Sequence, residues 1–375
     1  MEIKQLTLLF PEKVERHEKS KPPKDAYFFM PPEDEKINFV NNDPKSTRRK
    51  IFEIKEDYSD FEKSKLKLLK EQIQNLISQE NEDLIPLNEW KDTELLRFHQ
   101  STSFRTEKTI ELLRENLVWK KGKIFPLNLN ENVKKILNSG FVYVHGRDSH
   151  FRPVIVVSAQ TYLNFKNKFE FEDIVTAVIY FIEYIINYML IPGQVENWDI
   201  IADLNNVSLF GIPDTLRKIF KILQSNYRAR LNVVYILGKN PWFNALWTIV
   251  KAILDSNTNK KFILVDENSK YKMFEFINNE QVEKKYGGLA KNVDGEIDGY
   301  FPPIIPSENF LKQSDQREEF LISEEMYIEL YHQGRISRLS PYMIDKINKR
   351  GSFLSQPKFE SKIFFKYFKL IFNPS

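Results

Sequence analysis

The chain has 375 residues, enough for one large domain or two smaller ones that each bury a core. Hydrophobic residues make up 42% and aromatic residues 14%, which is typical of a folded globular protein. The formal charge of +3 provides no overall basic field, so nucleic acid is not an expected partner. The lack of cysteine excludes disulfides, thiolate zinc sites and cysteine nucleophiles, and it favours a reducing, cytoplasmic setting.

Residues 1–59 have the composition of a tail. Runs rich in Lys and Glu alternate with the proline pairs Pro22-Pro23 and Pro31-Pro32, and no period is visible. Two short apolar clusters, Tyr27–Met30 and Ile51–Ile54, offer docking points on the body of the protein or on a partner. Composition favours disorder over docking.

A helical unit is expected over residues 60–125. Apolar residues recur there at steps of three and four from Phe61 onward, which is the helical period. Asp92 is the expected N-cap of a short helix within this unit. A further helix near Val133 is expected to stop at Ser139-Gly140, since glycine commonly ends helices.

The pattern changes to short strands after residue 140. Phe141–Val144 and Val154–Val157 flank a polar connection and predict a strand pair. His145 and His150 lie in that connection, which we interpret as a solvated hairpin tip and not as a metal site. The apolar run Glu172–Leu190 predicts a buried helix, because Glu183 interrupts it and a membrane span needs ~20 largely uncharged residues.

Three further strands are expected at Ile200–Leu204, Val233–Leu237 and Phe262–Val265. The two helices between them open at Pro213 and Pro241, where proline suits a first helical turn. Strand–helix alternation predicts an α/β fold with a mixed, mostly parallel sheet and right-handed crossovers.

A series of short motifs runs in order from about residue 60 to residue 300. They are Leu95–Arg105, Trp119-Lys120, Phe151–Val154, Ile200–Leu204, Asn226–Leu231, Asn240–Trp247, Leu254-Asp255, Lys261 and Tyr286–Gly288. In this order they resemble the CRAL-TRIO family of lipid-binding and lipid-transfer proteins. The continuous part from Asn226 to Trp247 is the most specific.

The resemblance implies a CRAL-TRIO domain over residues 126–303, preceded by the helical unit. It implies an apolar pocket floored by the sheet and covered by a helical gate, Pro241–Leu254. The residues of that gate are apolar around most of the helix, as expected of a helix that is buried or faces an apolar ligand. The expected pocket and gate residues are Trp242, Phe243, Leu246, Trp247, Val250, Ile253 and Leu254.

The resemblance also identifies positions that bind a phosphoinositide headgroup, and several of them differ here. Lys261 matches a lysine that contacts the headgroup. Gln100 and Thr102 stand where the family has an Arg-x-Arg pair, and Arg228 and Ala229 replace a proline and an acid. A buried phosphate needs several fixed donors, so these departures argue against exchange of phosphatidylinositol.

No catalytic set and no cofactor or metal site are expected. The sequence has neither a glycine-rich phosphate loop nor a nucleophile elbow. Tyr286-Gly287-Gly288 is expected to serve backbone geometry. In the helical extension 304–375, a surface helix is expected at Glu324–Gln333. Lys362–Phe372 is basic and amphipathic, which suits an anionic membrane and docking on protein equally well.

Two functions follow as hypotheses. The first is a non-enzymatic protein that binds or transfers a phospholipid or other hydrophobic ligand, located in the cytoplasm or at a membrane surface. The second is a structural subunit of a ciliary or mitochondrial assembly that keeps the fold without lipid exchange. Its partners would be held through the N-terminal and C-terminal extensions.

Overall fold

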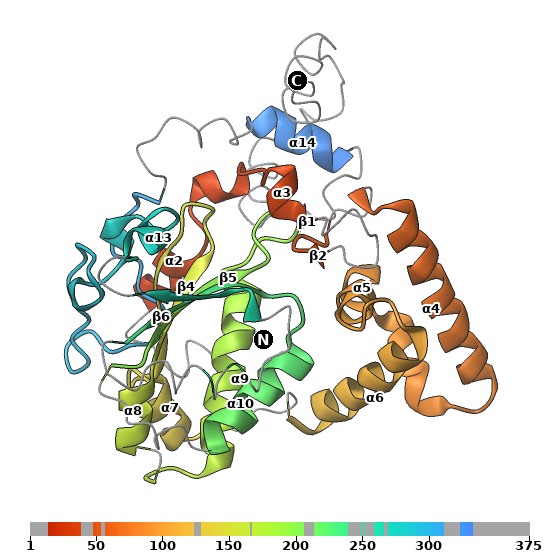
Figure 1. Cartoon of the computed structure of the whole chain (residues 1–375), viewed down its shortest axis with the longest axis horizontal. Coiled ribbons are helices and arrows are strands. Elements are labelled where there is room, and N and C mark those ends of the chain that lie inside the picture. Colours follow the sequence, from red (N-terminus) through yellow and green to blue (C-terminus); the bar gives the residue numbers. More distant parts are fainter. Residues whose placement is uncertain are drawn as a thin grey trace.

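The structure is a computed structural model that describes residues 14–38, 48–53, 57–123, 129–165, 167–205, 214–238, 248, 251, 259–265, 269–310 and 323–332. A twisted sheet forms the centre of a domain in which helices α7 to α10 gather on one side of the sheet (Figure 1). Helices α4, α5 and α6 stand apart as a separate group beside this domain. The expected α/β class is confirmed.

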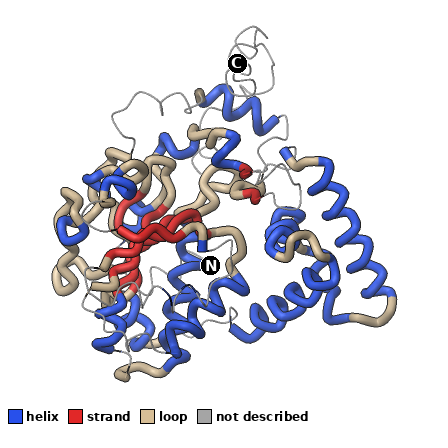
Figure 2. The backbone as a smooth tube through the Cα atoms, viewed as in Figure 1, coloured by secondary structure: helices blue, strands red, loops and turns tan. Residues whose placement is uncertain are grey.

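The five strands of the central sheet follow one another in space in their sequence order, β3-β4-β5-β6-β7. β3 and β4 are antiparallel, and every later neighbour is parallel. Figure 2 shows the strands gathered in the middle of the domain. All five expected strands are confirmed, at β3 (Val142–Arg147), β4 (Pro153–Ser158), β5 (Trp198–Asp203), β6 (Leu231–Leu237) and β7 (Phe262–Val265).

The helices beside the sheet bury the largest hydrophobic core. They are α7 (Glu131–Leu137), α8 (Ala159–Phe165), α9 (Phe171–Tyr188) and α10 (Asp214–Asn226). As predicted, α7 stops just before Ser139-Gly140, where Gly140 has a φ of +77°. α10 is described from Asp214 onward, and its predicted opening at Pro213 lies outside the described residues.

Helix α9 is the apolar helix that the sequence predicts to be buried, and its interior positions from Ile174 to Ile185 are almost all buried. The interrupting Glu183 accepts a hydrogen bond of 2.9 Å from the Tyr227 hydroxyl, so its carboxylate has a partner on the domain. Within the described residues, no helix has the length and apolarity that crossing a bilayer requires.

The helical unit consists of α4 (Asp60–Ser78), the 3-10 segment η5 (Glu82–Glu89), α5 (Asp92–Ser101) and α6 (Thr106–Lys123). Leu66, Leu69 and Ile73 of α4 are buried in its core, as their spacing predicts. The N-cap of α5 is Lys91 and not Asp92, because Asp92 already belongs to the first turn and Glu94 accepts from the Lys91 amide at 3.3 Å. The expected boundaries at residues 60, 126 and 304 stay predictions.

Residues 14–38 form a segment that we call the N-terminal strap. It contains α2 (Val14–Ser20), η2 (Lys24–Tyr27), α3 (Glu33–Lys36) and β1 (Ile37–Asn38), and β1 pairs with β2 (Arg48–Arg49). Ala26, Tyr27 and Phe29 lie in the main core. The expectation of disorder is therefore wrong for the described part of the tail, which docks on the body of the protein.

Arg147, at the end of β3, anchors this strap. Its fully buried guanidinium donates to the carbonyls of Ser20, Phe151 and Met189 at 2.9, 2.7 and 3.1 Å. Ser20 ends α2 and Met189 caps α9, so two helix C-termini direct their negative dipole ends at one cation. Burial lowers the pKa of Arg147 to about 10, which still leaves it charged at neutral pH.

The opposite face of the sheet is covered by α13 (Tyr271–Phe274) and the 3-10 turns η6 (Asn279–Gln281) and η7 (Lys284–Tyr286). Gly287 ends η7 with a φ of +91°, and the Gly288 amide donates to the Glu283 carbonyl. The geometric role expected for Tyr286-Gly287-Gly288 is confirmed. The expected surface helix is α14 (Glu324–His332), whereas Lys362–Phe372 lies outside the described residues.

Candidate functional site

One face of the sheet carries two unbroken rows of apolar side chains. Residues paired side by side across neighbouring strands point to the same face, so the register defines each row. The first row is Val144, Ile155, Ile200, Val234 and Phe262. The second row is Val142, Val157, Ala202, Ile236 and Leu264.

The two rows divide into two parts. Over β3, β4 and the start of β5 their side chains belong to the same hydrophobic core as α9. Over the rest of β5, β6 and β7 they continue with residues that we call the apolar floor. The floor consists of Ala202, Val234, Ile236, Phe262 and Leu264. Val234 and Ile236 are 3% and 2% exposed. The floor is apolar throughout and offers nothing for acid–base chemistry.

The gate predicted from the sequence cannot be located on this floor. Trp242, Phe243, Leu246, Trp247, Val250, Ile253 and Leu254 all lie outside the described residues. Lys261 is described and stands directly before β7. Its ammonium group donates to the backbone carbonyl of Leu231, at the start of β6, and so lies at the amino-terminal edge of the parallel strands. A headgroup contact for Lys261 stays a prediction.

The residues that replace the family's headgroup charges make contacts within the chain. Gln100 accepts from the Arg49 amide at 2.6 Å and donates to the Arg49 carbonyl at 3.1 Å, so it holds β2 as a neighbouring strand would. The Thr102 hydroxyl bonds to Thr109 at 2.7 Å inside the helical unit. Ala229, with a φ of +55°, directs its carbonyl toward Arg97 and Asn197 at 3.1 and 2.9 Å.

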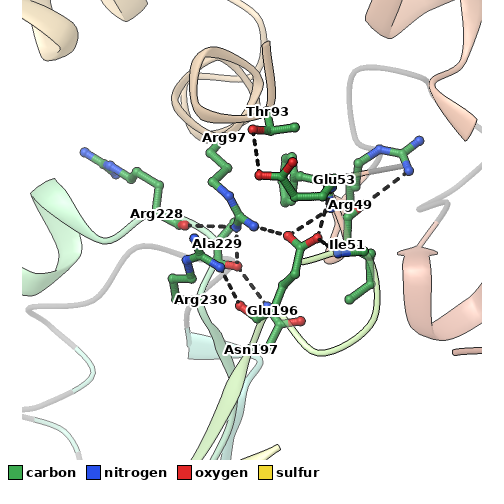
Figure 3. A network of polar contacts seen from close by, with 12 residues as sticks. Arg49, Ile51, Glu53, Thr93, Arg97, Glu196, Asn197, Arg228, Ala229 and Arg230 are labelled. Carbon is green, nitrogen blue, oxygen red and sulfur yellow. Dashed lines mark hydrogen bonds and ion pairs between the residues drawn. The ribbon is translucent and has the colours of Figure 1, made fainter. Parts of the chain in front are cut away.

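Glu196 is the centre of a buried polar network that sequence reasoning missed (Figure 3). Its carboxylate accepts from the amides of Phe52, Glu53 and Gly193 at 3.1, 2.9 and 2.8 Å, and it forms an ion pair with Arg97. The network therefore joins the segment after β2, helix α5 and the loop before β5. Nothing in the residues next to Glu196 marks it as a junction, because its partners after β2 and on α5 are 99 to 144 residues away in sequence.

The arginines of this network have partners within the chain. The Arg97 guanidinium also lies 4.1 Å from the Phe52 ring centroid, and Arg230 donates to the Glu196 carbonyl at 3.0 Å. Burial, reinforced by the nearby Arg97 cation, lowers the pKa of Arg230 to about 9. Arg49 forms two hydrogen bonds of 2.8 and 2.7 Å with the fully buried Glu62. These cations are committed to internal partners and are poorly placed to bind an added phosphate.

His145 and His150 are buried, at 2% and 7% exposure, so the interpretation of a solvated hairpin tip is wrong. The strap covers this tip, since Phe29 packs edge-on against His150 with ring centroids 5.3 Å apart. The His145 ring donates from Nδ1 to the Gln281 carbonyl at 2.8 Å. No cluster of three or more potential metal ligands occurs among the residues that the structure describes.

A fully buried pair of carboxyl groups, Asp148 and Asp199, lies under the same tip. Asp148 accepts from the Arg152 amide at 2.7 Å and from its guanidinium at 3.2 Å. Asp199 accepts from Asn232 at 2.8 Å, while its other oxygen faces Asp148. Burial, together with the neighbouring Asp148, raises the pKa of Asp199 well above its ordinary value. A proton held by Asp199 lets it donate to Asp148.

The change Asp199→Asn tests this proton. An unfolded aspartate ionises near pH 3.9, so above that pH the folded wild type binds the extra proton and loses stability as pH rises. Asparagine can keep the hydrogen bond from Asn232 and has no titrating group. We expect the variant to gain stability relative to wild type by up to about 1.4 kcal/mol per pH unit above pH 4. Urea unfolding between pH 4.5 and 7.5 measures this, and a pH-independent difference would show that Asp199 is ionised in the fold.

Comparison with known proteins agrees with this architecture. Residues 137–288 match the family model described as CRAL/TRIO domain. Clavesin-1 of Xenopus laevis is 26% identical over 213 residues, which cover 54% of this chain and 62% of clavesin-1. The phosphatidylinositol/phosphatidylcholine transfer protein SFH12 of Arabidopsis thaliana is 25% identical over 275 residues, or 67% of this chain and 48% of SFH12.

Another relative, protein real-time of Anopheles gambiae, is 27% identical over 187 residues, 45% of this chain and 27% of that protein. The chain thus spans less than two thirds of the length of these relatives. Among solved structures, that of Sfh5 superimposes with a TM-score of 0.49 at 16% identity, over 67% of this chain and 94% of Sfh5.

Proposed function

We propose, from the premise that this chain is a divergent member of the CRAL-TRIO family, that it binds a lipid or another hydrophobic ligand and performs no chemistry on it. The observation that carries the proposal is the apolar floor over β5, β6 and β7. Five apolar side chains line that floor, and none of them can act as an acid, a base or a nucleophile.

Strand order supports a ligand site above this floor. From β4 to β7 each parallel strand lies next to the previous one, always toward the same edge of the sheet. If every crossover is right-handed, all the connecting helices lie on one face of the sheet. The core shared by α8, α9, α10 and the apolar rows identifies that face. We therefore expect the connection from β6 to β7, with the proposed gate residues from Trp242 to Leu254, to cover the floor.

We further propose that the ligand is held mainly by apolar contact and not through a phosphate. Arg49, Arg97 and Arg230 are bound to carboxylates and carbonyls, and Gln100 clamps β2 where the family has an arginine. Removing one of these cations from its partner would leave a buried charge uncompensated, at a cost of about 3–5 kcal/mol. A neutral lipid avoids that cost.

Ligand binding can be tested with the purified full chain. We expect mass spectrometry of an organic extract to recover a hydrophobic ligand, and uptake from vesicles of mixed phosphatidylcholine, phosphatidylinositol and neutral lipid to favour the neutral lipid. The change Ala202→Phe adds bulk at the centre of the floor and should lower ligand occupancy at least about tenfold, by overpacking the site. Val118→Phe, at a position that is 75% exposed on α6, is the matched control.

Two results would contradict the proposal in different ways. Equal ligand occupancy in the folded Ala202→Phe variant and in wild type would place the ligand away from the floor. An empty chain from several hosts that also takes up no lipid from vesicles would favour the alternative, a structural subunit that keeps the fold without lipid exchange.

A further inference from the structure

Histidines are concentrated under the N-terminal strap. The sequence has five, and His17, His145 and His150 all lie at the contact between the strap and the sheet domain. His145 borders a cavity of about 470 Å³, whose wall also includes Arg16 of α2 and Asp298. Arg16 donates to the carbonyls of Asp298 and Gly299 at 2.5 and 3.1 Å.

His17 is the histidine that the strap itself contributes. It is 3% exposed, and its ring lies edge-on to Tyr184 and Tyr188 of α9, with centroids 5.7 and 5.1 Å away. Nδ1 lies 2.7 Å from the Tyr184 hydroxyl, which lies 2.7 Å from the Ser20 hydroxyl. Ser20 in turn donates to the His17 carbonyl at 2.8 Å.

These distances form a closed chain of donors. With the proton of the neutral ring on Nδ1, His17 donates to Tyr184, Tyr184 donates to Ser20, and Ser20 donates to the His17 carbonyl. The second ring nitrogen, Nε2, has no hydrogen-bond partner in the part of the chain that the structure describes. A proton added to the ring would therefore create a buried N–H without an acceptor.

The charges around His17 do not compensate a cation. Burial lowers the pKa of His17, Lys21 lowers it further, and Glu18 opposes both. The groups that face His17 from the packed elements are Glu18 on α2, Lys21 just after it, Tyr184 and Tyr188 on α9, and the Arg147 guanidinium at Ser20.

His145 and His150 differ from His17 in the charged groups that surround them. Burial lowers the pKa of His145, while Glu283 and the Gln281 carbonyl favour its charged form and Lys285 and Arg16 oppose it. His150 faces the carboxylate of Asp148, with Nδ1 to Oδ2 at 4.0 Å, and the charge of Glu35 also acts on it. A cation at His150 would have acidic neighbours. Of the three histidines, His17 therefore has the surroundings that most disfavour a protonated ring.

We propose that His17 is a pH-sensitive latch, which holds α2 on α9 when neutral and releases α2 when it takes up a proton. Release would expose Tyr184 and Tyr188 of α9 and the guanidinium of Arg147, which ends β3. The population with α2 detached should grow about tenfold per pH unit below pH 6.5, until the pH reaches the pKa of the docked ring. Between pH 7.5 and 5.5 the expected gain is up to about tenfold.

Hydrogen–deuterium exchange of the full chain tests the latch. Each exchange rate is divided by the intrinsic rate of the unfolded chain at the same pH. This ratio should be up to about tenfold higher for the amides of residues 14–20 at pH 5.5 than at pH 7.5. His17→Gln keeps a neutral hydrogen-bonding group at this position, so it should remove most of that difference. His332→Gln changes an exposed histidine of α14 and should behave as wild type.

Residues 174–182 of α9 report on global unfolding and must keep their protection for the result to count as local release. Equal acid sensitivity of residues 14–20 in wild type and in His17→Gln would overturn the proposal, and so would full protection of these residues in wild type at pH 5.5.

Discussion

Replacing Glu196 with alanine is expected to lower the free energy of unfolding by about 3–5 kcal/mol. The change leaves the Arg97 side chain, only 7% exposed, without its carboxylate, and it removes the acceptor for three backbone amides. Because these partners lie on α5, on the segment after β2 and before β5, the contact between the helical unit and the sheet domain should weaken first. Urea unfolding measures the loss, and exchange of residues 92–101 locates it.

A surface ion pair provides the matched control. Glu131 and Lys134 form a bridge of 2.7 Å, but the Glu131 side chain is 75% exposed. Glu131→Ala should therefore change the free energy of unfolding far less than Glu196→Ala does. A double change, Arg97→Met with Glu196→Leu, should be less harmful than Glu196→Ala alone, since it removes the Arg97 charge together with its partner. A cost below about 1 kcal/mol for Glu196→Ala would mean that Arg97 finds another partner.

In the motif Tyr286-Gly287-Gly288, Gly288→Ala is expected to lower the free energy of unfolding by at least about 3 kcal/mol, more than the same change at Gly287. A Cβ atom at this position would lie 1.9 Å from the Val282 carbonyl oxygen, and neither backbone can move without breaking the turn between η6 and η7. At Gly287 the added Cβ would meet only the end of the flexible Lys270 side chain. Gly287→Ala should therefore lower the free energy of unfolding by about 1–2 kcal/mol, because alanine is strained in the left-handed conformation.

Gly122→Ala is expected to raise the free energy of unfolding, whereas the other two glycine changes lower it. Gly122 lies in α6, and a Cβ atom there would have no neighbour within 4 Å. Alanine favours a helix over glycine by up to about 1 kcal/mol, so this variant should be slightly more stable than wild type. Thermal unfolding of the three variants measures the order, and similar losses for Gly287→Ala and Gly288→Ala would contradict the steric argument.

The strands and long helices of this fold could be predicted because each one carries its own signal. The apolar runs at β5, β6 and β7 and the continuous apolar surface of α9 identify buried elements without knowledge of their partners. The strap could not be predicted in this way. Its mean composition is polar, and it is held by a few long-range anchors, such as Phe29 in the core and the Ser20 carbonyl on Arg147.

The candidate site was predictable to a similar extent. The apolar floor follows from the alternation of residues in predicted strands, whereas the sequence alone could not show that Gln100 binds the backbone of Arg49. The misinterpretation of the tip at His150 has the same origin. A polar, glycine-containing connection is normally solvated, but here Phe29 of the strap covers it.

The anchoring of the strap also has a consequence for synthesis of the chain. Ser20 is separated from Arg147 by 127 positions, His17 from Tyr184 by 167, and Arg16 from Asp298 by 282. The partners of the strap are made after the strap itself, the last of them after about 280 further residues, at roughly 5–20 residues per second. For that interval, Tyr27 and Phe29 have no core to enter, so their apolar side chains stay exposed during synthesis.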